Sequence, residues 1–347
     1  MLIWLGELTI ASWILSYGAE HLSEKYGAKF VGRVLLSIAT TLPEIAIVIY
    51  AAANGSYGVA IGSVLGSNLL MMTLGLAIML IIATTRLSKA PLKHIDVSTF
   101  KNDMLFLIFA AVISFILFLD GYNYLDGFIF LGLFAGYIVL SLYEMRIENK
   151  EKKVANTIKN NINNMDDNLD SKKKLIIEKN VPYNNKKFIK AIGAFFIGAI
   201  GIVIGAEPFI HSLEGFSIEV GISSVILAVI ISPIAGEMPE KISMMLLARK
   251  GAAGAAIAIA NVLGSKILNN TLLLAVAVFA AMYSFGFYET IEITELLYYQ
   301  IILVTIITII AVLPMFRNKI GLRFGLILLF MYIVSIFIQF LFPGSTH

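Results

Sequence analysis

The chain has 347 residues, of which 59% are hydrophobic and only 14% are charged, with a formal net charge of +3. Soluble domains carry about 25% charged residues, so this composition excludes an ordinary soluble protein and predicts a chain embedded in lipid. It contains no cysteine, which excludes disulfides and thiolate metal sites. The apolar segment Met1–Ala19 lacks a basic n-region, and we interpret it as a first membrane span and not as a cleaved signal peptide.

Apolar stretches recur along the whole chain. A membrane span needs about 20 apolar residues, and the pattern predicts ten transmembrane helices. They are expected at Leu2–Ala19, Val34–Ala53, Gly58–Ala83, Met104–Leu119, Leu125–Tyr143, Ile189–Phe209, Ile222–Leu247, Ala253–Ser284, Leu296–Met315 and Leu322–Phe342. Between the fifth and sixth lies the Asn- and Lys-rich segment Arg146–Lys190, which has too few apolar residues to fold and is predicted to be a disordered linker.

The positive charges predict an orientation, because Lys and Arg accumulate in the cytoplasmic loops of membrane proteins. All but two of the 26 basic residues lie in the odd-numbered loops, the linker included, and the even-numbered loops hold none. We therefore expect a multi-pass protein of the plasma membrane with both termini outside and the linker in the cytoplasm. The two exceptions, Lys241 and Lys266, lie inside predicted membrane helices.

The two sets of five helices share short motifs, and an odd number per half makes the halves enter the membrane in opposite senses. The related pairs are Thr40–Glu44 with Gly236–Glu240, Ser63–Ser67 with Asn261–Ser265, and Gly18–Glu20 with Gly205–Glu207. We predict an all-α integral membrane fold of ten transmembrane helices in two inverted five-helix repeats, which is typical of transporters. The expected units are residues 1–145, with the repeated motifs at about 34–83, the linker 146–187, and residues 188–347, with the motifs at about 222–284.

Three glutamates, Glu44, Glu237 and Glu240, lie inside predicted membrane helices. A charge at a helix centre costs about 2.5–3.5 kcal/mol on insertion scales, so three unpaired carboxylates would oppose insertion by roughly 8–10 kcal/mol. A bound cation, a proton or a basic partner must offset this cost. The simpler alternatives to a cation site are an ion pair with Lys241 or Lys266, and protonated acids.

Prolines directly precede two of these glutamates. Proline inside a helix removes a backbone hydrogen bond and frees carbonyl oxygens one turn earlier, so Pro43 and Pro239 are expected to expose carbonyls near Glu44 and Glu240. Carboxylates, hydroxyls and carbonyls are the oxygen ligands that Ca²⁺ binds, six to eight at a time. These residues predict Glu44, Glu240, Thr40, Thr41 and Glu237 as cation ligands, with the Asn269 amide as a further polar group of the site.

A lysine in the middle of a membrane helix needs a partner, and Glu237 is the expected partner of Lys266. Such a pair could act as an internal cation that exchanges with the transported ion or with a proton. The alternative is that Lys266 snorkels along a tilted helix. Asn68 and Asn270 join Lys266 as expected coupling or charge-compensating residues.

At these motifs the chain resembles the Ca²⁺/cation antiporter superfamily, and especially the prokaryotic sodium/calcium exchangers. Ala39–Glu44 resembles the family's Gly-Thr-Ser-Leu-Pro-Glu motif, and Gly62–Asn68 resembles its Gly-Asn-x-x-Gly-Ser-Asn element. The resemblance implies two central Ca²⁺-binding glutamates with hydroxyl ligands beside them. In this sequence the matching residues are Glu44, Glu240, Thr40, Thr41, Ser67 and Ser265.

Several positions depart from that family pattern. Met71 and Lys266 each stand where the family has Asn, and Asn269 stands where it has an acidic residue. The pair Gly236–Glu237 replaces a Thr-Ser pair. Because these positions bind Na⁺ in the family, the resemblance implies a changed coupling to Na⁺.

We therefore expect a secondary-active antiporter that exchanges Ca²⁺ for Na⁺ by alternating access, with no enzymatic activity and no cofactor. The alternative is exchange of Ca²⁺ or another cation for H⁺ on the same fold, with Glu237 and Lys266 titrating. A cation channel lined by the acidic residues is a further alternative. The expected partners are inorganic cations and the lipid bilayer, with no nucleic acid. A monomer is expected to be functional, and the oligomeric state stays open.

Overall fold

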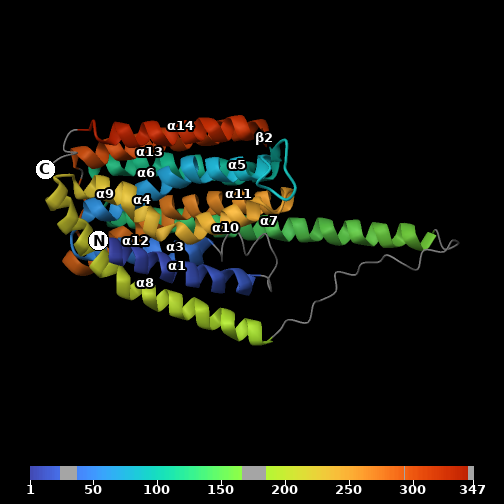
Figure 1. The fold of residues 1–347 in the computed structure, drawn as a ribbon, viewed down its shortest axis with the longest axis horizontal. Coiled ribbons are helices and arrows are strands. Elements are labelled where there is room, and N and C mark those ends of the chain that lie inside the picture. Colours follow the sequence, from blue (N-terminus) through green and yellow to red (C-terminus); the bar gives the residue numbers. More distant parts are fainter. Residues whose placement is uncertain (24–36, 166–184, 293, 343–347) are drawn as a thin grey trace.

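The computed structural model describes residues 1–23, 37–165, 185–292 and 294–342. Within these residues the protein is almost entirely helical (Figure 1). The α-helices are α1 (Leu2–Ser23), α3 (Ser37–Ala53), α4 (Tyr57–Leu70), α5 (Leu76–Thr84), α6 (Lys101–Leu117), α7 (Tyr124–Met165), α8 (Asn185–Val220), α9 (Ser224–Gly236), α10 (Met238–Ala248), α11 (Ala252–Leu268), α12 (Leu274–Phe285), α13 (Glu295–Val312) and α14 (Leu322–Gln339). Short 3₁₀ turns cover Ser98–Phe100, Phe118–Asp120 and Leu313–Arg317.

Many of these helices have the length and composition of membrane spans. Among the described residues, seven helical segments are long and apolar enough to cross a bilayer. They are Tyr57–Thr84, Ser98–Asp120, Tyr124–Glu144, Ile189–Val220, Ala252–Phe285, Glu295–Arg317 and Leu322–Gln339. Three shorter apolar helices lie at Leu2–Leu15, Thr41–Ala53 and Ser224–Ile234. The helical character predicted for these stretches is confirmed.

Two of the long segments change their helical hydrogen-bonding pattern near the middle. Met71–Gly75 is a π-helical turn between α4 and α5, and Asn269–Leu273 is a π-helical turn between α11 and α12. Each begins four residues after the serine of a Gly-Ser pair, Ser67 in one case and Ser265 in the other. π-turns inside α-helices are rare and frequently lie at functional sites. The two matched turns therefore indicate where a functional site is to be sought.

The seventh predicted span, Ile222–Leu247, is broken into two helices, which corrects the prediction that Pro239 lies inside a helix. Helix α9 ends at Gly236 and α10 begins at Met238, with Glu237 between them at φ −98° and ψ 2°. Pro239 therefore lies in the first turn of a new helix and not inside one. Proline is well suited to that position, where its missing N–H leaves no hydrogen bond unmade. Pro43, in contrast, lies inside α3 as predicted.

The predicted disordered linker over residues 146–187 is also partly wrong. Helix α7 continues without interruption to Met165, and α8 already begins at Asn185; residues 166–184 lie outside the described residues. Figure 1 shows the second half of α7 projecting beyond the bundle. Even a polar, Asn- and Lys-rich segment can extend an existing helix, because continuing a formed helix does not carry the cost of a new nucleus.

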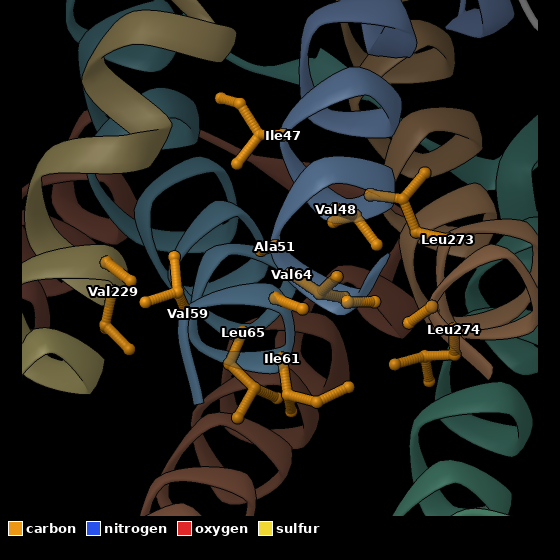
Figure 2. Packing of buried hydrophobic residues seen from close by; sticks show 14 of the residues in the cluster. Ile47, Val48, Ala51, Val59, Ile61, Val64, Leu65, Val229, Leu273 and Leu274 are labelled. Atoms are coloured by element: carbon orange, nitrogen blue, oxygen red, sulfur yellow. The ribbon is translucent and has the colours of Figure 1, made fainter. Parts of the chain in front are cut away.

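Apolar packing holds α3 and α4 against α9 and α12. Figure 2 shows Ile47 and Val48 of α3 in one buried cluster with Val64 of α4 and Leu274 of α12. Helices α4 and α9 approach closely at Gly66, because a methyl group there would lie 2.1 Å from the carbonyl oxygen of Val229. A second buried cluster lies among α5, α11 and α14. The helices that carry the polar residues are thus fixed by close packing.

Two backbone pairings join the loops at the ends of the bundle. Strand β1 (Ile95–Asp96), between α5 and α6, pairs antiparallel with β2 (Lys319–Ile320), between α13 and α14. At the other end of α6, Tyr122 forms an antiparallel bridge with Ile291, between α12 and α13. In the first loop the Ser98 N–H donates to Asp96 Oδ1 (2.9 Å), which lowers the pKa of that carboxyl.

Candidate cation site

The motif Thr40–Glu44 places Glu44 in the interior, on α3 directly after Pro43. Its side chain is only 3% exposed, and its Oε2 atom has no hydrogen-bond partner among the described residues. The carboxyl group faces the break between α9 and α10, because a methyl group on Gly236 would lie 3.1 Å from both Cγ and Cδ of Glu44. A buried carboxylate thus meets the point at which a helix is interrupted.

Glu240 lies on the opposite side of that break, in the first turn of α10. It is 1% exposed and receives two hydrogen bonds from α11, from Asn261 Nδ2 to Oε1 and from Ser265 Oγ to Oε2, each 3.1 Å long. A carboxylate in a first helical turn is stabilised by the positive end of the helix dipole. Both carboxylate oxygens are therefore oriented by α11 at the start of α10.

Glu237, the residue at the break, forms an ion pair with Lys266 of α11, and both side chains are fully buried. Lys266 Nζ also donates to Ser67 Oγ (2.7 Å), and Ser67 Oγ donates to Glu237 Oε1. Glu237 Oε2 has no hydrogen-bond partner among the described residues. Since Lys266 is held inside the protein, it does not snorkel to the surface, and its partner is the one expected from the sequence.

Amide groups extend this network. With the Asn269 amide oriented so that donors meet acceptors, its Oδ1 accepts from Lys266 Nζ (3.1 Å) and its Nδ2 donates to the Ser265 carbonyl (3.2 Å). Asn270 Nδ2 donates to the Lys266 carbonyl (2.9 Å), and Asn68 Nδ2 donates to Asn270 Oδ1 (3.1 Å). Polar groups of α4 and α11 are thus connected around Lys266.

Most of the predicted site residues are buried in the same region. Thr41 is 1% exposed on α3, while the side chain of Thr40 lies outside what the structure describes. Within the described part of the chain, no three His, Cys, Asp or Glu side chains come together as metal ligands. A cation held here would therefore need hydroxyl, amide and carbonyl oxygens beside the carboxylates, which is how Ca²⁺ is usually bound.

Sequence reasoning missed one residue that contacts a central glutamate. Asn261, which donates to Glu240, stands at the Asn position of the Gly-Asn-x-x-Gly-Ser element in the second half, four residues before Ser265 on the same helix face. That match was a sufficient signal. Lys241 donates to the Pro233 carbonyl (3.1 Å), which also accepts from the Glu237 N–H.

Apolar helices around a buried cluster of carboxylates, lysines and amides define a helical membrane protein that holds charged groups in its interior. The chain belongs to the sodium/calcium exchanger protein family, which matches residues 2–143 and 190–341. It is thus a membrane transporter of that family, and the resemblance read from the sequence motifs is confirmed.

Individual relatives agree with this family assignment. The chain is 26% identical over 276 residues to the uncharacterized membrane protein MJ0091 of Methanocaldococcus jannaschii, covering 77% of this chain and 78% of the relative. Its fold is similar to that of the H⁺/Ca²⁺ exchanger CAX (TM-score 0.75, 20% identity, 99% of this chain and 81% of that chain). It is also similar to the sodium-calcium exchanger NCX_Mj (TM-score 0.62, 22% identity, 96% and 95%). At this level of identity, the two structures show a common fold.

Proposed function

We propose that the protein is a secondary-active antiporter that exchanges Ca²⁺ for Na⁺ by alternating access, with Glu44 and Glu240 as the central cation ligands. The observation that carries the proposal is the Glu44 carboxylate, which is buried in a membrane transporter with one oxygen lacking any donor among the described residues. Burying a charge without compensation is very costly, and a divalent cation between the two glutamates would remove that cost.

The remaining ligands follow from the geometry around these two glutamates. Ser265 already touches Glu240, and Ser67, Glu237 and Asn269 form the adjoining network. Thr41 lies one turn before Glu44 on α3, and Thr40 is included by the family resemblance. Lys266, Asn68 and Asn270 would adjust the charge and the geometry of the site and not bind the cation directly.

We further propose ten membrane-spanning helices in two inverted repeats, residues 1–145 and 188–347. The seven long apolar segments and the three shorter ones support that number. The loop pairings support the symmetry. The β1–β2 pairing joins the loop between the third and fourth predicted spans of the first half to the loop between the fourth and fifth spans of the second half. The Tyr122–Ile291 bridge, at the opposite end of α6, joins the fourth-to-fifth loop of the first half to the third-to-fourth loop of the second half. The two π-turns add a third matching feature.

The orientation proposed from the basic loops has the termini outside the plasma membrane and residues 146–187 in the cytoplasm. Figure 1 supports a common side for the termini, since the start of α1 and the end of α14 lie at one end of the bundle. The projecting part of α7 and strand β2 lie at the other end (Figure 1). Lys and Arg are concentrated in the loops at that second end, as the positive-inside rule requires.

Exchange against H⁺ is the second candidate, and one observation favours it. Lys266 and Glu237 form a buried pair at positions where the resembling family carries uncharged residues, and Met71 of the first π-turn offers no hard oxygen ligand. Both changes reduce the number of Na⁺ ligands. The family match gives no support to a channel.

Transport by the purified protein in liposomes tests the proposal. Uptake of radioactive calcium would be followed with Na⁺-loaded vesicles, with an imposed pH gradient, and with neither, beside protein-free liposomes. Uptake that requires internal Na⁺ supports Ca²⁺/Na⁺ exchange, and uptake that follows only the pH gradient supports the H⁺ alternative. Ca²⁺ flux without any counter-ion would indicate a channel. If no Ca²⁺ moves but Mg²⁺ or Mn²⁺ does, the substrate assignment is wrong.

A further inference from the structure

The ammonium group of Lys266 lies in a cage of oxygen atoms. Its neighbours are Glu237 Oε1, Ser67 Oγ (2.7 Å), Asn269 Oδ1 (3.1 Å) and the Ser67 carbonyl (3.4 Å). These oxygens come from the α9–α10 break, from α4 and from the second π-turn. Carboxylate, hydroxyl, amide and carbonyl oxygens are also the ligands that a hard metal cation binds. In this protein the Lys266 ammonium group occupies that position.

This ion pair is separate from the carboxylates that remain for transported ions. Lys266 and Glu237 are both completely buried, and removing either one would leave an uncompensated buried charge. Two other glutamates face the same region, Glu44 across Gly236 and Glu240 beside Ser265. The neighbouring cation, Lys241, is engaged by the Pro233 carbonyl on the α9 side. Among the described residues, Lys266 is the lysine whose ammonium group contacts a buried glutamate, and this contact engages Glu237 while Glu44 and Glu240 have no lysine in contact.

We infer that Lys266 is a tethered cation that fixes the exchange at two monovalent ions for each Ca²⁺. The inference rests on the proposed function. With Glu237 compensated by Lys266, one Ca²⁺ or two monovalent cations neutralise Glu44 and Glu240 equally well. The protein then passes between its two orientations with the same total charge for either load, so that exchange moves no net charge across the membrane.

The wild-type protein in liposomes tests this directly. Ca²⁺ accumulation would be measured at equilibrium with a fixed gradient of the driving monovalent ion, at zero potential and at about 100 mV set by valinomycin and K⁺. Electroneutral exchange predicts the same Ca²⁺ ratio at both potentials. One net charge per cycle would change that ratio about 50-fold, and this result would overturn the inference while leaving Ca²⁺ exchange established. Absence of Ca²⁺ exchange under every gradient would instead contradict the proposed function.

Paired variants identify the residue responsible. Lys266→Met exposes Glu237 to a third monovalent ion, so its Ca²⁺ ratio should become potential-dependent by about 50-fold at 100 mV. The double variant Lys266→Met with Glu237→Gln removes both charges and should return to potential-independent exchange. Lys319→Met is the control, because it removes an exposed lysine of strand β2 at the end of the bundle, and its charge stoichiometry should stay that of the wild type. Potential-independent exchange by Lys266→Met at the wild-type rate would refute the role of this lysine.

Discussion

The carboxyl group of Glu44 lies directly against Gly236, so that a methyl group at position 236 would stand 3.1 Å from the Glu44 Cδ atom. One residue belongs to α3 and the other ends α9, so the contact places the Glu44 carboxyl group beside the break between α9 and α10. Contacts of this length are tighter than ordinary carbon packing. The glycine is therefore required for the Glu44 carboxylate to keep its place, which makes the pair a sensitive point of the site.

Gly236→Ala should lower the apparent Ca²⁺ affinity about tenfold, because the added methyl group displaces the Glu44 carboxylate by a few tenths of an ångström. The thermal stability should change little, since alanine at a helix end is intrinsically better than glycine by up to about 1 kcal/mol. Ca²⁺ titration of transport together with thermal unfolding in detergent measures both. Gly132→Ala is the control, because a methyl group there meets nothing within 4 Å. Equal effects of the two substitutions would show that the contact is unimportant.

Removing the charge of Glu44 tests its role as a ligand. Glu44→Gln keeps the shape of the side chain and removes the negative charge, so Ca²⁺ uptake should fall at least 100-fold if this carboxylate binds the cation, in keeping with a loss of about 3 kcal/mol. Because burial of the uncompensated charge is relieved, the thermal stability without Ca²⁺ should be unchanged or higher. The measurements are initial uptake rates and the unfolding temperature with and without Ca²⁺.

The matched control for this substitution is Glu207→Gln on α8. The Glu207 side chain is 54% exposed, and its Oε1 atom lies 4.0 Å from His211 Nε2 on the same helix. It should transport at the wild-type rate. If Glu44→Gln retained Ca²⁺ uptake comparable to that of Glu207→Gln, Glu44 would not be a cation ligand, and the central part of the proposal would be wrong.

Much of this candidate site was predictable, because polar residues are rare in membrane helices and burying each one costs free energy unless it has a partner. Glu44, Ser67, Glu240 and Ser265 could be found from repeated motifs alone, and the fold class followed from apolar lengths. The interruption at Glu237 could not, because Pro239, two residues further on, fits either a helix interior or a helix start. Only the packing of the neighbouring helices decides between them.

The same limit explains the other correction. Composition predicted disorder after residue 145, since that segment has no apolar face to bury. Composition says nothing about the preceding helix, however, and α7 provides a formed nucleus from which polar residues can continue to Met165. Asn261, in contrast, could have been identified from its place in the repeated motif, although its contact with Glu240 depends on the broken α9–α10 geometry.

Asn261→Ala should weaken Ca²⁺ binding by removing one of the two donors that orient Glu240. A lost hydrogen bond to a buried charged group costs about 1.5–3 kcal/mol, which corresponds to roughly a 10- to 100-fold rise in the Ca²⁺ concentration for half-maximal transport. Ser265→Ala removes the other donor and should have a similar effect. Since both residues hold the same carboxylate, the double variant should lose less than the sum of the two effects.

The control for this series is Asn54→Ala, because Asn54 is exposed and its amide donates only to a backbone carbonyl of its own helix. It should leave the Ca²⁺ dependence unchanged. Strict additivity of Asn261→Ala and Ser265→Ala would indicate that the two residues act on different groups, contrary to the geometry at Glu240.

Gly66→Ala tests the packing that positions Ser67 and not the ligands themselves. A methyl group at Gly66 would lie 2.1 Å from the Val229 carbonyl oxygen, so α4 must move away from α9. Overpacking of this kind costs about 1–3 kcal/mol, and the unfolding temperature in detergent should fall by several degrees. Because Ser67 is the next residue and contacts Lys266, transport should fall as well. Gly132→Ala again serves as the control. An unchanged unfolding temperature would mean that α4 and α9 are not as closely packed as the structure describes.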